Sequence, residues 1–194
     1  MKTASLVAVT LVCAAFSAGP AAAQLGLGTP SVQSDTRGLG IGMQINRIGL
    51  ETGGSPRLPG AGLGLTLSYG MTDNLSLFGR ATTGYRTSQF DLGARYRFAS
   101  PSSALRPYVE AGVTRLGGIL AAPGIGGSPP PPRSWGLGVT VGAGVEYHVS
   151  PRFAVDLGVL HTQGRMVTPA LPDGPHFREK FLSNRMQMGF TWRP

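Results

Sequence analysis

Apolar and polar positions alternate with a period of two along most of the chain. The clearest case is Trp135 to His148, whose odd positions carry tryptophan, leucine, valine, alanine and tyrosine. Its even positions carry glycine, threonine, glutamate and histidine. Successive side chains of a strand point to opposite faces, so this segment is predicted to be a strand with one apolar and one small or polar face.

The same alternation recurs eight times, and each predicted strand is 8 to 14 residues long. Strands of soluble domains usually have about 5 or 6 residues, whereas a strand that crosses a membrane needs about 9 to 11. Phe78 and Leu160 put an apolar side chain on the polar face, through interior packing or a local slip of register. The predicted strands are Leu39–Arg47, Gly62–Tyr69, Leu75–Tyr85, Ser88–Phe98, Leu105–Arg115, Trp135–His148, Phe153–Thr162 and Ser183–Arg193.

Alternation alone does not say which face is outside, because a soluble lipocalin-like barrel would hide its apolar face. The polar face here is too poor in charge for the water-facing surface of eight strands. After residue 23 the only lysine is Lys180, which we place in a loop. Aromatic residues also gather at the strand ends of the apolar face, as in the girdles of membrane barrels. This girdle is predicted to hold Tyr69, Tyr96, Phe98, Trp135, Tyr147, Phe153, Phe190 and Trp192.

The connections between the predicted strands alternate in length. Residues 70–74, 99–104 and 149–152 form short turns with turn-forming residues. Three of the four opposite connections are long and rich in glycine and proline: 48–61, 116–134 and 163–182. Short periplasmic turns and longer external loops are typical of outer-membrane barrels. We therefore predict an all-β fold, an eight-stranded antiparallel up-and-down transmembrane barrel, closed because an open edge in lipid leaves backbone groups unpaired.

The first residues resemble a secretory signal. Lys2 is followed by an apolar run over residues 6–16 and by three alanines at 21–23, which offer a cleavage site. We expect a cleaved signal peptide at 1–23, a flexible leader at 24–37 and a barrel at 38–194. Val12 before Cys13 argues against a lipid anchor, and Cys13 is the only cysteine. A chain that begins at Gln24 would thus be neither a disulfide scaffold nor a cysteine-ligated zinc protein.

Two hairpins carry a family resemblance. Val139 to Val159 reads VTVGAGVEYHVSPRFAVDLGV, and Leu67 to Phe78 reads LSYGMTDNLSLF. With these tight turns the chain resembles the small eight-stranded outer-membrane barrels of the OmpA/OmpX type over nearly all of 39–193. It departs from that pattern at its end, where Arg193 and Pro194 follow the usual terminal aromatic residue. The resemblance implies a monomer in the outer membrane, with its lipid, lipopolysaccharide and the outer-membrane assembly machinery as partners.

The predicted inward face holds charges of both signs. In a barrel of eight strands the interior is just wide enough to be filled by side chains. A gated or ion-selective pore is one interpretation, and a polar plug that pairs its own charges is the one we favour. The residues of this predicted structural network are Arg80, Asp91, Arg95, Arg97, Glu110, Glu146, Asp156 and Arg185.

The sequence offers little catalytic chemistry. His161 lies near the predicted outer rim, where a lipid A deacylase would need a His-x-Ser motif, but the chain reads His161-Thr162-Gln163. His148, His161 and His176 show no metal-ligand spacing. The net charge after Lys2 is removed is about +7, but the sequence shows neither a basic stripe nor a stacking platform. We therefore do not expect nucleic-acid binding. We predict no catalytic residues, cofactor or metal.

We therefore predict an integral barrel with a structural or surface-binding role and a plugged polar interior. The alternatives are a narrow channel for small or apolar solutes and a lipid A-modifying enzyme. The predicted loops contain no readable motif, although four consecutive prolines at 129–132 would form a stiff segment suited to a partner.

Overall fold

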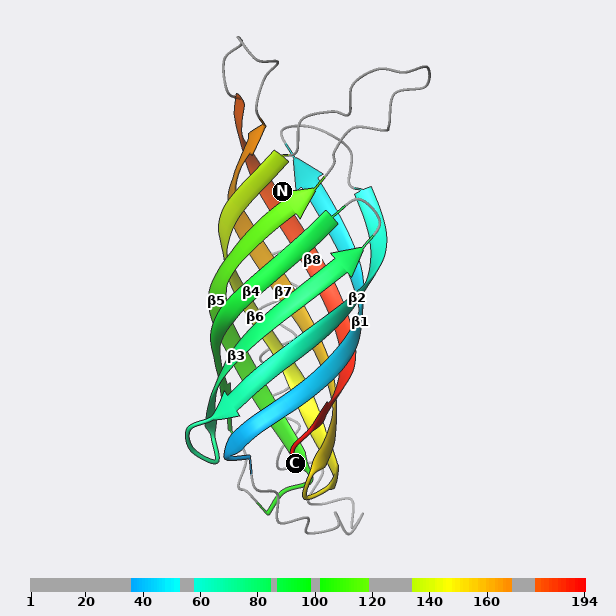
Figure 1. Cartoon of the computed structure of the whole chain (residues 1–194), viewed down its shortest axis with the longest axis vertical. Coiled ribbons are helices and arrows are strands. Elements are labelled where there is room, and N and C mark those ends of the chain that lie inside the picture. Colours follow the sequence, from blue (N-terminus) through cyan, green and yellow to red (C-terminus); the bar gives the residue numbers. More distant parts are fainter. Residues whose placement is uncertain (1–35, 53–57, 85–86, 99–101, 119–133, 169–176) are drawn as a thin grey trace.

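The structure is a computed structural model that describes residues 36–52, 58–84, 87–98, 102–118, 134–168 and 177–194. Eight strands form a closed antiparallel barrel in chain order, as predicted (Figure 1). The expected signal peptide and most of the expected leader lie outside the described residues. The strands are β1 (Gly38–Thr52), β2 (Leu58–Gly70), β3 (Leu75–Gly84), β4 (Thr87–Arg97), β5 (Leu105–Gly118), β6 (Ser134–Ser150), β7 (Phe153–Thr168) and β8 (Phe177–Trp192).

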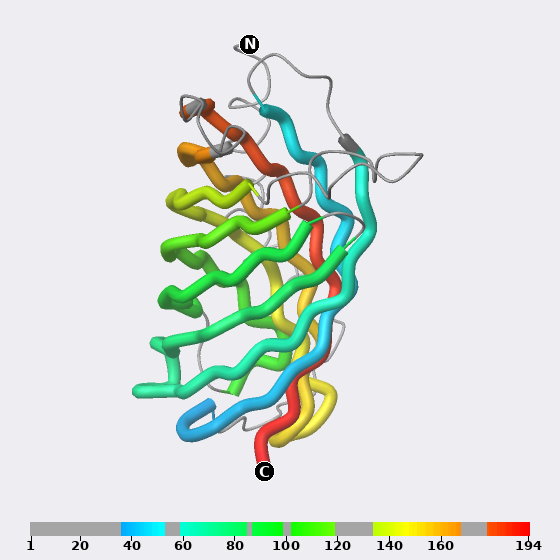
Figure 2. Tube along the Cα trace, turned by 45° about the horizontal axis from the view of Figure 1, so that its top comes forward, coloured from blue at the N-terminus to red at the C-terminus, as the bar shows by residue number. Residues whose placement is uncertain are grey.

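The barrel is closed by pairing between the first and last strands. Ile41 of β1 lies opposite Trp192, and Thr52 lies opposite Phe181, so β1 and β8 are side by side (Figure 2). Starting at Ile41 and following its lateral neighbours around all eight strands leads back to β1 at Glu51, ten residues further on. This stagger requires the strands to be tilted against the barrel axis.

Among the described residues, no helix has the length and apolar character to cross a membrane.

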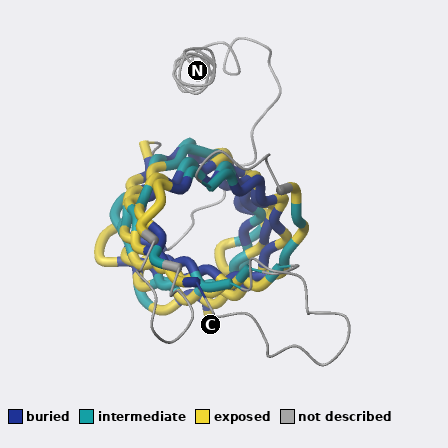
Figure 3. The backbone as a smooth tube through the Cα atoms, turned by 90° about the horizontal axis from the view of Figure 1, so that it is seen from above, coloured by how far each residue is buried: buried dark blue, intermediate teal, exposed yellow. Residues whose placement is uncertain are grey.

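The alternation of the sequence becomes an inside and an outside. Viewed along the axis, the buried residues line the lumen and the exposed ones form the outer wall (Figure 3). On β6, Val139 and Val141 are more than half exposed, whereas Thr140 between them is buried. The outer wall is therefore apolar and the lumen polar, the arrangement predicted for a barrel that has lipid as its outer solvent.

We call the two ends of the barrel the turn end, where 71–74 and 151–152 connect strands, and the loop end, where 53–57, 119–133 and 169–176 lie between strands. At the loop end the predicted strand limits were too short. Residues 48–52, 58–61, 116–118, 163–168 and 177–182 belong to strands rather than to loops. Lys180, predicted to lie in a loop, is part of β8.

The physical reason is an inversion of the alternation near the loop end. Ile48, Leu50, Leu116 and Phe181 point inward and are buried, while Arg47 points outward and is exposed. The prediction assumed that inward residues are polar. It therefore placed the end of each strand at the point where this inversion begins. The strands nevertheless continue, because hydrogen bonding between their backbones does not depend on which face is apolar.

Phe78 and Leu160, the two exceptions to the predicted faces, keep the register and point into the lumen, where both are buried. The predicted slip of register is therefore absent, and these side chains are interior packing. A Cβ atom at Gly93 would lie 2.9 Å from the Phe78 ring, and one at Gly142 would lie 2.9 Å from Leu160. Glycines on the neighbouring strand, directly opposite Phe78 and Leu160 in the pairing, thus make room for the large side chains.

We expect Gly144→Ala to lower the free energy of unfolding by about 1–3 kcal/mol, the usual cost of overpacking. A Cβ there would lie 2.3 Å from the carbonyl oxygen of Leu157 and 2.6 Å from the Tyr108 ring, so backbone would have to move. Gly79→Ala is the matched control, because a Cβ at Gly79 meets nothing within 4 Å. Urea unfolding of both variants in lipid vesicles tests this, and equal stabilities would contradict the packing.

Candidate functional site in the barrel lumen

Glu110 of β5 is the centre of the ion-pair network that crosses the lumen. Arg80 of β3 donates to both of its carboxylate oxygens, from Nη1 to Oε1 at 2.9 Å and from Nη2 to Oε2 at 3.2 Å. Arg95 of β4 donates to Oε2 from Nε at 3.0 Å and from Nη2 at 2.8 Å. The Glu110 and Arg80 side chains are fully buried. Such charge-assisted, paired hydrogen bonds are among the strongest that side chains form.

Glu146 of β6 forms a second centre nearer the turn end. Arg97 donates to its Oε2 from Nη2 at 3.0 Å, and Arg95 does so from Nη1 at 3.3 Å. Arg193, which follows β8, donates to Oε1 at 3.4 Å, and His148 Nε2 lies 2.8 Å from that same oxygen. Arg95 therefore links the two carboxylates into one network.

Asp91 of β4 holds the third cluster, on the loop-end side. Arg185 reaches it across the lumen from β8, with 2.5 Å between Nη2 and Oδ2. Thr114 donates to Asp91 Oδ1 at 2.7 Å and also contacts the Thr140 hydroxyl, which lies 2.7 Å from that of Thr162. The threonine ladder thus continues the polar network around the wall.

Asp156 of β7 lies at the edge of the network. Its Oδ2 accepts weak hydrogen bonds from Tyr108 at 3.5 Å and Gln187 at 3.4 Å, and it lies 4.0 Å from Arg95. The Arg95 guanidinium is stacked over the Tyr108 ring at 3.8 Å from its centroid. This cation–π contact fills the middle of the lumen with ring and guanidinium.

Above these clusters, at the loop end, the lumen is apolar. A buried cluster, which we call the apolar plug, is formed by Leu50, Leu116, Met166 and Phe181. Phe181 has no solvent-accessible surface. A Cβ at Gly164 would lie 2.5 Å from the Phe181 ring, so the ring lies directly against the glycine backbone of the wall. The described interior is thus filled by apolar groups above the charged layers.

All eight residues of the predicted interior network face the lumen and are buried. The structure brings them together with residues that the prediction left out of the network, among them Tyr108, His148, Gln187 and Arg193. The alternation of odd and even positions along each strand had already placed these four residues on the polar face. Arg106, also on the inward face, donates to the Asp73 carbonyl at 2.7 Å and ties a turn to the lumen.

The eight residues of the predicted aromatic girdle point outward. Tyr96 and Phe98 meet edge to face at 5.2 Å, and Phe153 stacks on Phe190 at 5.6 Å. Seven of the eight lie toward the turn end, and Trp135 alone lies toward the loop end.

His161 is the candidate that the enzyme hypothesis would need. It points outward from β7, between Val141 on one side and Asn184 on the other, and its Nδ1 lies 2.8 Å from Asn184 Oδ1. The outward neighbours on its own strand are Val159 and Gln163. None of these supplies a nucleophile. Within the described residues, no group of acidic, histidine or cysteine side chains could hold a metal ion.

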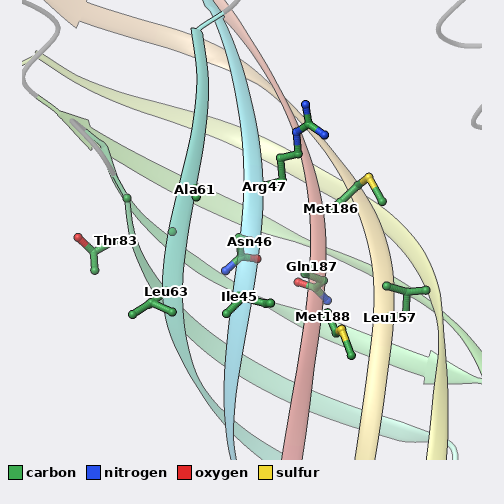
Figure 4. A pocket seen from close by; sticks show the side chains of 12 residues that line it. Ile45, Asn46, Arg47, Ala61, Leu63, Thr83, Leu157, Met186, Gln187 and Met188 are labelled. Carbon is green, nitrogen blue, oxygen red and sulfur yellow. The ribbon is translucent and has the colours of Figure 1, made fainter.

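A groove of about 690 Å³ lies across β1, β2 and β8 (Figure 4). Its exposed lining is largely apolar and includes Ile45, Leu63, Met186 and Met188. Arg47 and Thr83 are the exposed polar residues of the lining. Because β1 pairs with both neighbours without a break along this stretch, the groove is a hollow of the outer wall and not an entrance to the lumen.

The chain is similar to known membrane barrels. A family model described as outer membrane protein beta-barrel domain matches residues 8–174. No curated protein matches the chain. Neisserial surface protein A is 18% identical, with a TM-score of 0.57, and the match covers 80% of this chain and 97% of that one. The outer membrane protein OprG from Pseudomonas aeruginosa is 14% identical, with a TM-score of 0.51 and coverage of 83% and 98%. The outer membrane enzyme PagL is 18% identical, with a TM-score of 0.40 and coverage of 74% and 97%.

Proposed function

The chain belongs to the outer membrane protein β-barrel family, and on that basis we propose that it is an integral barrel that acts through its outer surfaces and carries no solute through its lumen. Its location is the outer membrane. The proposed role is structural or surface-binding, with the interior charges serving stability.

The observation that supports this proposal is the filling of the lumen, where the hollow beside Arg95 and Arg97 measures about 20 Å³, room for about one water molecule. From the turn end upward, the interior holds the Glu146 cluster, the Glu110 and Tyr108 layer, the Asp91 cluster and the apolar plug. A conducting path needs a continuous column of water, whereas these side chains contact one another across the axis. Eight-stranded barrels are just wide enough for such filling.

A channel is the principal alternative, and the energetics of the network argue against it. Opening a path along the axis would separate Arg80 and Arg95 from Glu110, leaving buried charges without partners. Breaking one such buried pair costs about 3–5 kcal/mol. The open state would thus be sparsely populated unless a ligand stabilised it.

We expect the purified protein to give no conductance steps in planar phospholipid bilayers. Incorporation is verified by the heat-dependent shift in gel mobility of protein recovered from the same membranes, because closed barrels resist detergent until heated. Steps that change their ion selectivity in the Glu110→Gln variant would show that the lumen conducts, and would overturn the proposal.

The enzymatic alternative has less support in the geometry. A lipid A deacylase needs a nucleophile or an activated water near its histidine. The described neighbours of His161 are Val141, Val159, Gln163 and Asn184. His161 lies in the middle of β7, level with Val141, and not at the predicted outer rim. The arrangement is that of a mid-wall histidine held by an amide, and we assign it no catalytic role.

A further inference from the structure

Cations gather on the outer wall at the loop end. Arg115 of β5, Leu137 of β6, Arg165 of β7 and Lys180 of β8 are lateral neighbours in one unbroken row. All four side chains are exposed and point outward. Neighbouring strands lie about 4.8 Å apart, so the row extends roughly 14 Å along the wall. We call Arg115, Arg165 and Lys180 the basic row.

The basic row contains a direct like-charge pair. Arg165 and Lys180 lie opposite each other across β7 and β8. Like charges in that position destabilise a sheet. Among the residues that the structure describes, neither they nor Arg115 take part in a side-chain hydrogen bond or ion pair. Every inward arginine of the Glu110 and Glu146 clusters, by contrast, has a carboxylate partner.

Acidic side chains near the row do not neutralise it. Glu51 points outward from β1 opposite Leu182, which makes it a diagonal neighbour of Lys180. The two side chains form no ion pair among the described residues. Glu179 lies at the rim of the barrel, at a position of β8 that faces inward. In the part of the turn end that the structure describes, the outer wall carries aromatic residues and no matching row of cations. The cation excess thus belongs to one end of the lipid-facing wall.

From this asymmetry we propose that the basic row binds the phosphates of lipid A, the phosphorylated glycolipid of the outer leaflet. The row lies directly above outward valines such as Val113 and Val139, so its ligand must combine acyl chains with an anionic head. Arg165 and Lys180 together fit one phosphate, and Arg115 beyond Leu137 fits a second group on the same disaccharide. The inference extends the proposed function to a ligand and does not require the lumen to be closed.

The test uses the full chain in zwitterionic detergent, titrated with bisphosphorylated lipid A and followed by native mass spectrometry. We expect Arg165→Gln/Lys180→Gln to raise the apparent Kd by about tenfold or more, because two charge-assisted contacts are lost. The matched control is Arg37→Gln/Arg152→Gln, which removes the same charge at the turn end, where Arg37 makes an exposed ion pair with Asp73. The control should bind like the unchanged protein.

A second readout separates a binding site from a structural effect. In phosphatidylcholine vesicles without lipid A, Arg165→Gln/Lys180→Gln should unfold at the same or a higher urea concentration, because repulsion is removed. Adding lipid A should stabilise the unchanged protein and not this variant. Equal binding by both double variants would overturn the proposal. Equal stabilisation by phosphatidylglycerol would also overturn it, since the row would then be a general anionic-lipid contact.

Discussion

Replacing Glu110 with glutamine is expected to lower the free energy of unfolding by about 3–5 kcal/mol. The glutamine has nearly the same volume, so packing is retained. What changes is the charge, because Arg80 and Arg95 together donate four hydrogen bonds to the Glu110 carboxylate from buried positions. Asp91 lies 3.6 Å from Arg80 and compensates only part of the loss.

The measurement is urea unfolding of protein refolded in phospholipid vesicles, with the emission of Trp135 and Trp192 as the signal. Glu51→Gln is the matched control, because this acid lies on the outer wall, where single charges contribute little. A double variant that also carries Arg80→Met should lose less than the sum of the single changes, since fewer charges are left unpaired. Unchanged stability of Glu110→Gln would show that the network does not hold the barrel together.

Along the middle of each strand, the sequence was sufficient to predict which residues face the lumen. Parity along each strand places Glu110, Arg95 and Arg80 on one face, because side chains alternate with a period of two. Parity does not determine the partners. Arg95 is the direct lateral neighbour of Glu110, but that requires the register between β4 and β5. Arg185 reaches Asp91 from the opposite wall, which depends on the barrel's width.

The loop end shows where the pattern is insufficient. The rule that polar residues face inward holds only while the outer wall meets lipid tails. Near the loop end Arg165 and Lys180 point outward while Met166 and Phe181 fill the lumen. Beyond the lipid tails the outward positions become polar and the inward positions apolar. The alternation therefore persists, but with the two faces exchanged. The end of a strand must therefore be predicted from loss of alternation, and not from its reversal.

The second prediction with a large expected effect on the free energy of unfolding concerns a charge placed on the outer wall. Val141 lies near the middle of β6, points outward and is 51% exposed. If this wall meets hydrocarbon, an arginine there must be desolvated or must deform the bilayer, at a cost of about 2–4 kcal/mol near the midplane. Leu105 points outward at the turn end of β5. An arginine at this position should cost only about 0–1 kcal/mol, because it reaches the interface.

The most direct test of the central claim, that the apolar face of the barrel is its lipid-facing outside, is therefore the urea stability of Val141→Arg beside Leu105→Arg in phospholipid vesicles. The account predicts a loss of about 2–4 kcal/mol for Val141→Arg and a small one for Leu105→Arg. Two small and equal losses would contradict it, because they would mean that the outward face of β6 is in contact with water.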